Sequence, residues 1–227
     1  MFLTNENKIK WKWLLIASVV TLVLVLTGIF WYDKPLFLFL RNFDGLWANA
    51  INIVFDWKNW IILAGMATFV VYVKKTVNTT DSVVKRVKWF NIKAHFLDFI
   101  EKTKTSYAFF IFCSVFGTGV AVKLLKTFIG RARPIFFEAL NMTGFYPPST
   151  EWAFNSMPSG HTAVSFAGLV MIGLLAPKYK WLTWSLAIVV GVSRVCAGAH
   201  WPTDILLGAF VGMVFADFAK SAICSRI

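Results

Sequence analysis

Cysteine is scarce in this chain of 227 residues, and the few cysteines form no recognisable pattern. The three of them, Cys113, Cys196 and Cys224, lie in or beside apolar stretches, and no Cys-x-x-Cys pair occurs. An odd number of scattered thiols excludes a disulfide framework and a zinc site of the usual cysteine spacing. We interpret the three side chains as buried core thiols. Because no His, Cys and carboxylate cluster occurs either, we expect no metal and no cofactor.

Charged residues are scarce as well, and acidic residues most of all. Charged residues make up 15% of the chain, with 11 Asp and Glu against 23 Lys and Arg, for a formal net charge of +12. A soluble domain is about one-quarter charged, so this composition is atypical of one. A basic excess can indicate nucleic-acid binding, but no basic run interleaved with base-stacking aromatics occurs here. We expect no nucleic-acid partner, since cytoplasmic loops of a membrane protein carry such an excess.

Long apolar stretches are abundant by contrast. Hydrophobic residues make up 58% of the chain, and a helix needs about 20 mostly apolar residues to cross a bilayer. Six stretches approach this length, at residues 13–31, 57–73, 105–125, 161–176, 181–197 and 204–223. The first resembles a signal peptide but is long and lacks a small-residue cleavage site, so we interpret it as a span. We predict an all-α, integral-membrane bundle of six transmembrane helices, forming a single domain over residues 1–227.

Two connecting segments are expected to lie at the membrane surface. Residues 35–41 are apolar but too short to cross a bilayer. Residues 74–104 are polar and basic, with apolar side chains spaced among the charges at Val84, Val87, Phe90, Phe96 and Phe99. This pattern predicts an interfacial amphipathic segment that contacts anionic lipid.

The distribution of basic residues predicts an orientation. Six spans place both termini on one side, and that side holds most of the Lys and Arg residues. By the positive-inside rule this side is cytoplasmic. We expect a multi-pass membrane protein with both termini cytoplasmic and the opposite side facing outward.

The few basic residues on the outward side belong mainly to three short segments at the outward ends of spans. These are Lys126 to Pro134 (KTFIGRARP), Pro158-Ser-Gly-His161, and Ser193 to Asp204 (SRVCAGAHWPTD). Ionisable residues at membrane depth are costly, so they indicate a functional site by default. Because helix packing brings the ends of spans together, we expect the three segments to form one pocket at the outer interface.

The pocket's cations and one helix start are suited to an anion. Lys126, Arg133 and Arg194 provide three positive charges, and guanidinium groups match phosphate oxygens. Residues 158–161 open a helix whose free N–H groups and dipole favour an anion. There Gly160 allows close approach, and the Ser159 hydroxyl can donate.

His200 and Asp204 are spaced four residues apart. If the last helix begins by His200, the two side chains share one face. The carboxylate then holds one ring nitrogen protonated and leaves the other free to attack a substrate.

Position for position, the three segments resemble the signature of the phosphatidic acid phosphatase type 2 superfamily, within residues 126–204. The resemblance implies a metal-independent phosphatase in which His200, with Asp204 beside it, attacks phosphorus and forms a phosphohistidine. It implies that His161 protonates the leaving oxygen and then activates water. It further implies that the equatorial phosphate oxygens are stabilised by Lys126, Arg133, Ser159, Gly160 and Arg194.

The expected substrate is an amphiphilic lipid phosphate, because the pocket lies at the interface of a bundle with no soluble domain. GRARP, the Phe-rich loop and FNSMPSGH look like the bacterial lipid A 1-phosphatase branch and related phosphatidylglycerophosphate phosphatases, which favours lipid A 1-phosphate. Undecaprenyl diphosphate is a further candidate. A lipid-to-lipid phosphotransferase is the alternative within enzymes, and a transporter or scaffold is the alternative outside them. The intact signature disfavours the second of these.

Polar residues outside the signature are assigned other roles. Arg131 contacts either a phosphate or headgroup, or anchors the protein at the interface. Asp217 lies inside the last span, and we expect it to pair with Lys220. Three loop residues either shape a headgroup site or are solvated, and we favour the solvated loop: Glu138, Trp152 and Asn155.

Overall fold

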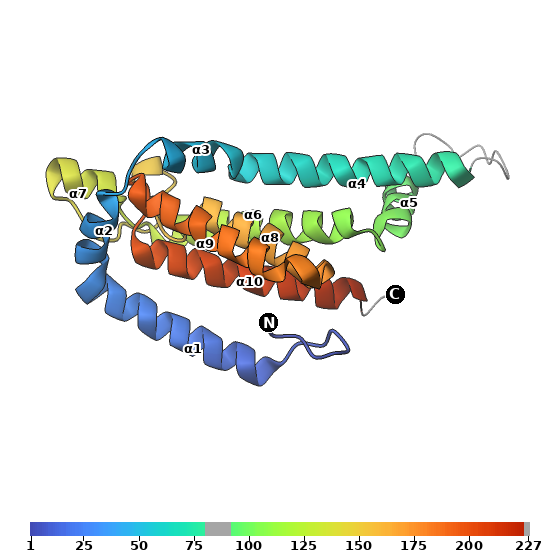
Figure 1. The fold of residues 1–227 in the computed structure, drawn as a ribbon, viewed down its shortest axis with the longest axis horizontal. Helices are drawn as coiled ribbons and strands as arrows, with labels where there is room; N and C mark the ends of the chain where they lie inside the picture. The colour runs from blue at the N-terminus through green and yellow to red at the C-terminus, as the bar shows by residue number, and fades with distance from the viewer. Residues whose placement is uncertain (80–91, 225–227) are drawn as a thin grey trace.

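The computed structural model describes residues 1–79 and 92–224, and nearly all of their regular structure is helical (Figure 1). The helices are α1 Trp11–Thr27, α2 Asp33–Arg41, α3 Leu46–Val54, α4 Trp57–Thr79, α5 Ile92–Thr103, α6 Tyr107–Ile129, α7 Pro134–Leu140, α8 Gly160–Leu175, α9 Lys180–Cys196 and α10 Pro202–Cys224. A π-helical turn, Gly28–Tyr32, joins α1 to α2. Short 3₁₀ turns and isolated β-bridges make up the rest of the regular structure in the described residues, which confirms the all-α prediction for them.

Four helical stretches are long and apolar enough to cross a membrane. They are Trp11–Arg41, Leu46–Val77, Tyr107–Ile129 and Pro202–Cys224. Each of the six predicted stretches lies on a helix, but α8 and α9 are short, with 16 and 17 residues. Pro177 follows α8 closely, and proline cannot continue a helix. Within the described residues the count of six spans is therefore not confirmed, although all six stretches are helical.

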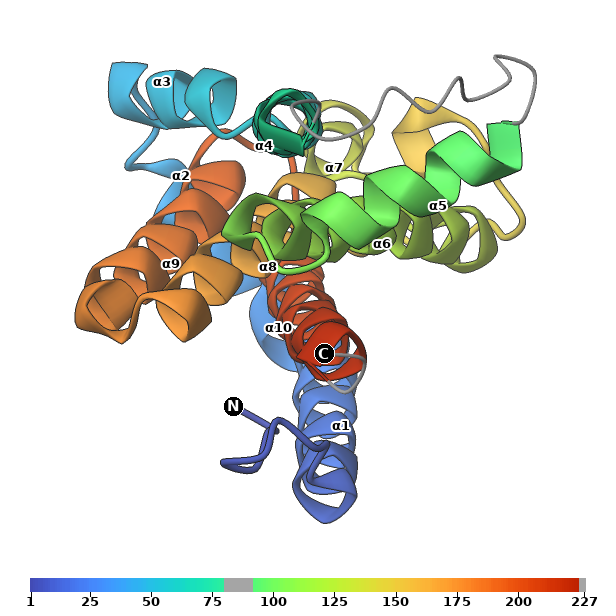
Figure 2. The same cartoon turned by 90° about the vertical axis from the view of Figure 1, so that its right-hand side faces the viewer.

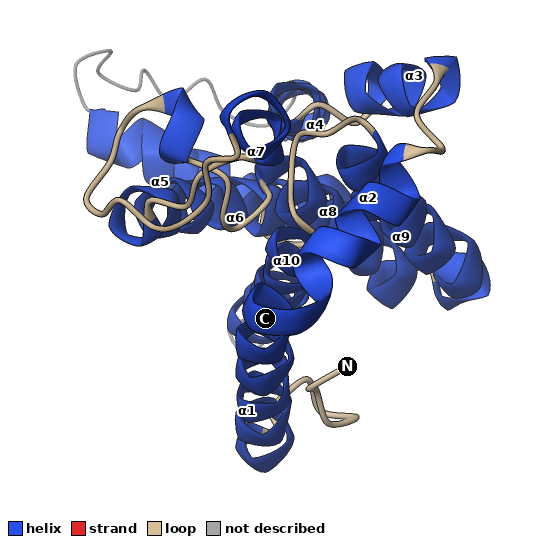
Figure 3. Ribbon diagram, turned by 90° about the vertical axis from the view of Figure 1, so that its left-hand side faces the viewer, coloured by secondary structure: helices blue, strands red, loops and turns tan. Residues whose placement is uncertain are grey.

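The connections between helices gather at two opposite ends of the molecule. α2, α3 and α7 lie at one end, and α5, the first residues of the chain and the last turn of α10 lie at the other (Figure 1). Seen along the long axis, α8 lies near the centre, and α1 stands apart beyond α10 (Figures 2 and 3). The end that carries α2, α3 and α7 therefore also receives the C-terminus of α6 and the loop that follows α7.

Two glycines bring α10 into backbone contact with α8. A Cβ atom on Gly212 would lie 2.2 Å from the carbonyl oxygen of Ala163, and one on Gly208 would lie 2.8 Å from that of Ser159. Small residues spaced four apart allow this close approach between membrane helices. The N–H of Ser159 also donates to the carbonyl of Asp204 over 3.0 Å. The start of α8 is thereby fixed against the start of α10.

Apolar clusters hold α4, α6 and α10 against α8. One cluster joins α4, α6 and α8 through Ala64, Val115, Val164 and Ala167, and a second joins α6, α8 and α10. Many large apolar side chains on α1 and α4 remain exposed, Leu15 and Leu63 among them. Exposed apolar faces of this extent are typical of helices that contact lipid.

The predicted basic connection is only partly covered by the structure. α4 continues to Thr79, beyond the predicted end at residue 73, and α5 occupies residues 92–103. The amphipathic prediction for Val84, Val87 and Phe90 lies outside the described residues.

The predicted pairing of Asp217 with Lys220 is wrong. Asp217 is buried and accepts a hydrogen bond of 2.6 Å from the N–H of Phe2, whereas Lys220 donates to the carbonyl of Leu174. The first residues of the chain fold back beside α10, so the N–H of Phe2 binds the carboxylate in place of Lys220.

Candidate active site

A cavity of about 770 Å³ contains most of the residues that the sequence singled out. Its lining includes Lys126, Arg133, Gly160, His161, Arg194 and His200. Apolar residues of α4 and α6 form another part of the wall, among them Trp57, Ile61, Phe116 and Val120. Ser159 and Asp204 are fully buried and do not line the cavity. The structure thus brings the three sequence segments together around one space.

A left-handed turn at the end of α6 places the first segment. Gly130 has φ +61°, and a Cβ atom there would lie 2.6 Å from the backbone of Tyr146. Glycine adopts this conformation without the steric cost that other residues have. Lys126 therefore remains on the last turn of α6, while the chain reverses and carries Arg133 to the start of α7.

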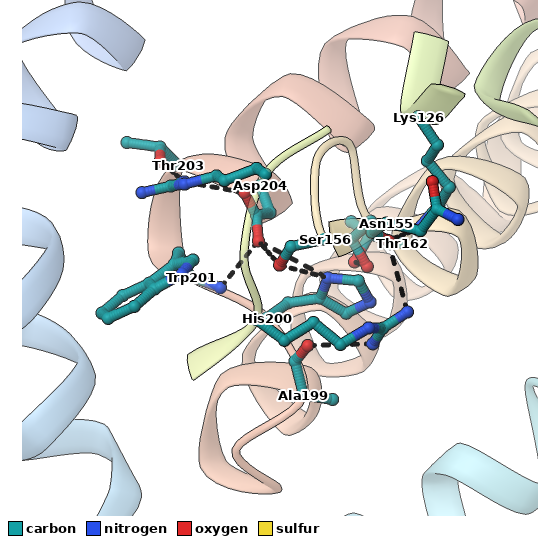
Figure 4. A network of polar contacts seen from close by, with 12 residues as sticks. Lys126, Asn155, Ser156, Thr162, Ala199, His200, Trp201, Thr203 and Asp204 are labelled. Atoms are coloured by element: carbon teal, nitrogen blue, oxygen red, sulfur yellow. Dashed lines mark hydrogen bonds and ion pairs between the residues drawn. The ribbon is translucent and has the colours of Figure 1, made fainter. Parts of the chain in front are cut away.

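His200 is buried, with one ring nitrogen facing a carboxylate and a hydroxyl (Figure 4). Its Nδ1 lies 3.5 Å from Oδ2 of Asp204 and 3.5 Å from Oγ of Ser156. Asp204 Oδ2 also accepts hydrogen bonds from the Ser156 hydroxyl and from the N–H of Trp201. Within the described part of the chain, no protein group is hydrogen-bonded to Nε2 of His200, so Nε2 is the nitrogen left for a ligand.

The position of His200 differs from the expected one. α10 begins at Pro202, because proline suits the first position of a helix, so His200 lies in the turn before the helix. The condition that the helix begins by His200 is therefore wrong. The i, i+4 contact with Asp204 forms all the same, since Asp204 reaches back from the first turn of α10.

The surroundings of His200 favour its neutral form. Burial first, and then the positive charges of Arg133, Lys126 and Arg194, lower the pKa of the His200 ring well below its ordinary value. At neutral pH the ring is therefore uncharged, and an uncharged ring nitrogen has the lone pair that a nucleophile needs.

Arg131 is neither a free headgroup ligand nor an interfacial anchor. It is buried and donates to Asp204 Oδ1 over 2.7 Å and to Asp33 Oδ2 over 2.6 Å. Burial lowers the pKa of Arg131, but the attraction of Asp204 and Asp33 outweighs it and raises the pKa above its ordinary value. Asp33 also accepts from the N–H and hydroxyl of Thr203. Sequence reasoning missed Asp33, although an acidic residue beside an apolar stretch in an acid-poor chain was a usable signal.

The loop after α7 contributes backbone carbonyls that bind the cations of the site, whereas we favoured a solvated loop. The carbonyl of Asn155 accepts from Lys126 and, over 3.3 Å, from Arg133, and Asn155 itself is buried. Arg133 also donates to the carbonyl of Trp152 over 2.9 Å and lies 4.4 Å from the centre of the Trp152 ring. Burial lowers the pKa of Arg133 to about 10, against the attraction of Asp204. Glu138, in contrast, pairs at the surface with Arg41.

The third cation still has donor capacity. Arg194 lines the cavity from the last turn of α9, and its Nε is buried without a hydrogen-bond partner in the described residues. An unsatisfied buried N–H is costly, so it indicates a partner that the protein itself does not provide. Together with Lys126, Arg133 and the N-terminus of α8, it makes the cavity suited to an anion with several oxygens.

His161 is the second histidine of the cavity, and its partner was not expected. It lies on the first turn of α8, with its Nε2 3.1 Å from Oδ2 of Asp56. Asp56 precedes α4 and belongs to a segment of mixed composition in which the sequence shows no motif. Among the described residues no group of three or more His, Cys, Asp and Glu side chains has the arrangement of a metal site.

Comparison with known proteins gives consistent similarities. The family model for the PAP2 superfamily matches residues 105–223. A lipid A 1-phosphatase of Rhizobium johnstonii is 39% identical over 107 residues, which are 47% of this chain and 44% of that protein. An undecaprenyl-diphosphatase of Sulfolobus acidocaldarius is 27% identical over 193 residues, covering 81% of this chain and 85% of that one.

A solved structure, the crystal structure of Aquifex aeolicus LpxE, is 19% identical with a TM-score of 0.46, covering 82% of this chain and 93% of that chain. The chain spans about half the length of the lipid A 1-phosphatases of Rhizobium that it matches.

Proposed function

The chain belongs to the PAP2 superfamily, and from that premise we propose that it is an integral-membrane phosphatase that releases phosphate from a lipid phosphate or diphosphate. The observation that carries the proposal is the cavity itself. It joins two histidines and three cations to an apolar wall from α4 and α6. A cavity with cations on one part of its lining and apolar side chains on another suits a substrate with a phosphate group and a hydrocarbon chain.

The proposed reaction has two steps. In the first, His200 Nε2 attacks phosphorus, an N–P bond forms and the P–O bond to the lipid breaks, while His161 gives a proton to the leaving oxygen. In the second, His161 takes a proton from water, the resulting hydroxide attacks phosphorus, and the N–P bond breaks to release inorganic phosphate and neutral His200. Asp204 orients His200 throughout.

The protein's own positive charges stabilise the phosphoryl group in this proposal. Lys126, Arg133 and Arg194 face the equatorial oxygens, where preorganised donors have their largest effect. Gly160 presents the N-terminus of α8, and Ser159 supports that turn through its bonds to Thr162 and Asp204. Because these groups supply the positive charge, we propose a metal-independent reaction. Activity that is lost on chelation with EDTA and restored by a divalent cation would contradict this.

Lipid A 1-phosphate is the substrate that we favour within this class. The similarity to the Rhizobium johnstonii protein supports it, over 107 residues or 47% of this chain. The longer match to the Sulfolobus acidocaldarius protein supports undecaprenyl diphosphate as the second candidate. Phosphatidylglycerophosphate, and transfer of the phosphoryl group to a second lipid instead of water, are the remaining alternatives.

We further propose that the chain crosses a bacterial inner membrane six times, with α8 and α9 as the two short spans. The site then faces the periplasm, and both termini and α5 lie on the cytoplasmic side. The gathering of α5, the first residues of the chain and the last turn of α10 opposite α2, α3 and α7 supports this arrangement (Figure 1). Labelling by an impermeant reagent tests it in intact spheroplasts, with single cysteines introduced at Lys178 or Thr143 after Cys113, Cys196 and Cys224 have been replaced with alanine. Only the second should react.

Phosphate release from purified protein tests the proposed function. The substrates are lipid A, undecaprenyl diphosphate, phosphatidylglycerophosphate and phosphatidate, each in mixed micelles, with and without an acceptor lipid. We expect release from at least one of them by the unmodified protein and none by the His200→Ala variant. Equal release by the two proteins would overturn the mechanism, and the absence of release from every lipid would overturn the function.

A further inference from the structure

Asp56 connects the start of α4 to the cavity through two different contacts. Its Oδ1 accepts a hydrogen bond of 2.8 Å from the N–H of Lys58, which caps the helix. Its Oδ2 lies 3.1 Å from Nε2 of His161. Asp56 lies outside residues 105–223, the part of the chain that the family model matches. The capping contact uses Oδ1 and explains why a carboxylate suits this position. It does not explain why Oδ2 points toward His161.

The two histidines of the cavity are held by opposite ring nitrogens. His200 presents Nδ1 to Asp204, which leaves Nε2 for the cavity. His161 presents Nε2 to Asp56, which leaves Nδ1. A carboxylate that accepts from one ring nitrogen keeps the proton there and fixes the orientation of the ring. Each histidine therefore has its own carboxylate, and the two carboxylates come from different parts of the chain.

We propose that Asp56 is the positioning residue for the acid–base step of His161, an inference that rests on the proposed phosphatase function. With both nitrogens protonated, Nε2–H donates to Asp56 while Nδ1–H points at the leaving oxygen. After Nδ1 has given up its proton, Asp56 keeps the remaining proton on Nε2. The lone pair at Nδ1 then faces the water of the second step, so the same nitrogen acts first as acid and then as base.

The charges around His161 show why this carboxylate matters. Arg194 on α9 and Lys126 on α6 line the same cavity as His161, and positive charges close to a ring disfavour its protonated form. Asp56, between α3 and α4, contacts the ring and carries the opposite charge, and 31% of its side chain is exposed. An opposite charge within hydrogen-bond distance favours the protonated ring that an acid must provide. Without Asp56, the cations of the cavity act on the ring unopposed by this contact.

The Asp56→Asn variant tests the inference with little disturbance of the fold. Asparagine caps helices as well as aspartate does, so the bond to Lys58 is kept while the charge is removed. We expect kcat/KM for an alkyl lipid phosphate to fall by about 10²-fold, a part of what general acid catalysis contributes. The basic limb of its pH profile should move to lower pH. For 4-nitrophenyl phosphate, whose leaving group needs no proton, we expect a much smaller fall.

The matched control is Asp44→Asn, which makes the same change twelve residues earlier, where the carboxylate pairs with Arg41 at the surface. It should change neither the pH profile nor the ratio of the two substrates. The double variant His161→Ala with Asp56→Asn should be no slower than His161→Ala alone, because Asp56 acts through the ring. An Asp56→Asn variant with the normal pH profile and the normal substrate ratio overturns the inference. So does a double variant in which the two losses multiply.

A measurement that needs no turnover separates this inference from the proposed function. The chain has three histidines, so ¹⁵N-histidine NMR with His161→Ala and His95→Ala controls assigns each ring. We expect the His161 ring to carry its proton on Nε2 when neutral, and its titration midpoint to fall in Asp56→Asn. A His161 ring that is protonated on Nδ1, or whose midpoint does not move, overturns the role of Asp56. Absence of phosphate release by the unmodified protein overturns the phosphatase instead.

Discussion

Asp33 and Arg131 are 98 positions apart in the chain and form a buried ion pair, with Oδ2 and Nη2 separated by 2.6 Å. The other guanidinium nitrogen of Arg131 reaches Asp204, the carboxylate that lies beside Nδ1 of His200. One side chain thus ties the junction of α1 and α2 to the proposed nucleophile. The N-terminal helices belong to the active-site structure through this contact, even though the family model begins only at residue 105.

Replacement of Arg131 with methionine should destabilise the protein strongly. It leaves Asp33 and Asp204 buried without their shared cation, and breaking a buried pair in this way costs about 3 to 5 kcal/mol. Thermal unfolding followed by tryptophan fluorescence in detergent measures the effect. Replacement of Arg41, whose ion pairs lie at the surface, is the control and should cost about 1 kcal/mol or less. Equal losses in the two variants would show that the buried network has no special role.

The pH dependence of kcat/KM should report the neutral state of His200. Because burial and the charges of Arg133, Lys126 and Arg194 lower the pKa of the ring, protonation and loss of the nucleophile require a pH well below 6.5. The acidic limb of the profile should therefore lie well below that value. Arg133→Gln removes one of the charges, so its acidic limb should move to higher pH. Because the variant also lowers the rate, the quantity to compare is the pH at which the acidic limb falls, and not the height of the profile.

The same pKa shift has a consequence for stability. In the unfolded chain His200 binds a proton near pH 6.5, and in the folded protein it does so only at lower pH. Stability should consequently fall as the pH drops below about 6.5 and stop falling, for this group, once the folded ring is protonated too. A His200→Phe variant should lack this part of the pH dependence of the unfolding temperature.

Removal of the charge on Arg194 should lower kcat. Its buried Nε has no hydrogen-bond partner in the described residues, and loss of one preorganised donor typically costs about 10²- to 10³-fold in kcat. We expect a loss of this order in Arg194→Gln and incomplete recovery in Arg194→Lys, because lysine lacks the planar fork. Lys178→Gln, a change in an exposed turn at the opposite end, is the control. An Arg194→Gln variant with normal kcat and normal inhibition by inorganic phosphate would remove Arg194 from the site.

The packing of α8 against α10 predicts a difference between two glycine substitutions. Gly212→Ala places a methyl group 2.2 Å from the carbonyl oxygen of Ala163, and overpacking of this kind costs about 1 to 3 kcal/mol. Gly65→Ala places one 3.5 Å from the ring of Phe112, an ordinary contact, and alanine favours a helix by up to about 1 kcal/mol. The unfolding temperature should fall in the first variant and hold or rise in the second. A Gly212→Ala variant as stable as the Gly65→Ala variant would contradict the close helix contact.

The sequence predicts the parts of the site that have local patterns. The ends of the apolar stretches, together with the family resemblance, placed Lys126, Arg133 and Arg194 beside His161 and His200, because helix packing joins such ends. Asp33 and Asp56 were missed, since each is a single acidic residue whose partner is about a hundred positions away. Hydrophobic periodicity carries no information about a pairing between residues so far apart in the sequence. The partner of Asp217 was missed for the same reason.

Element boundaries at the site also depend on contacts that the sequence does not show. Pro202 indicates a helix start, and by that rule His200 could have been placed before α10. The His200 ring is held there by Asp204, whose carboxylate accepts hydrogen bonds from Ser156 and Trp201. Ser156 comes from another loop. The lengths of α8 and α9 show a similar limit, because hydropathy gives apolar stretches and not the exact turn at which a helix ends.

The apolar wall of the cavity is at the same time part of the outer surface of the bundle. Phe116, Val120 and Leu124 line the cavity, and each is about half exposed on α6. If the proposed function is right, a lipid substrate can reach the proposed phosphate site by sideways diffusion within one leaflet, without passing through water. The rate should then follow the mole fraction of substrate in the micelle or bilayer and not its bulk concentration. Dilution of the substrate with an inert detergent, at constant total substrate, should slow the reaction in proportion.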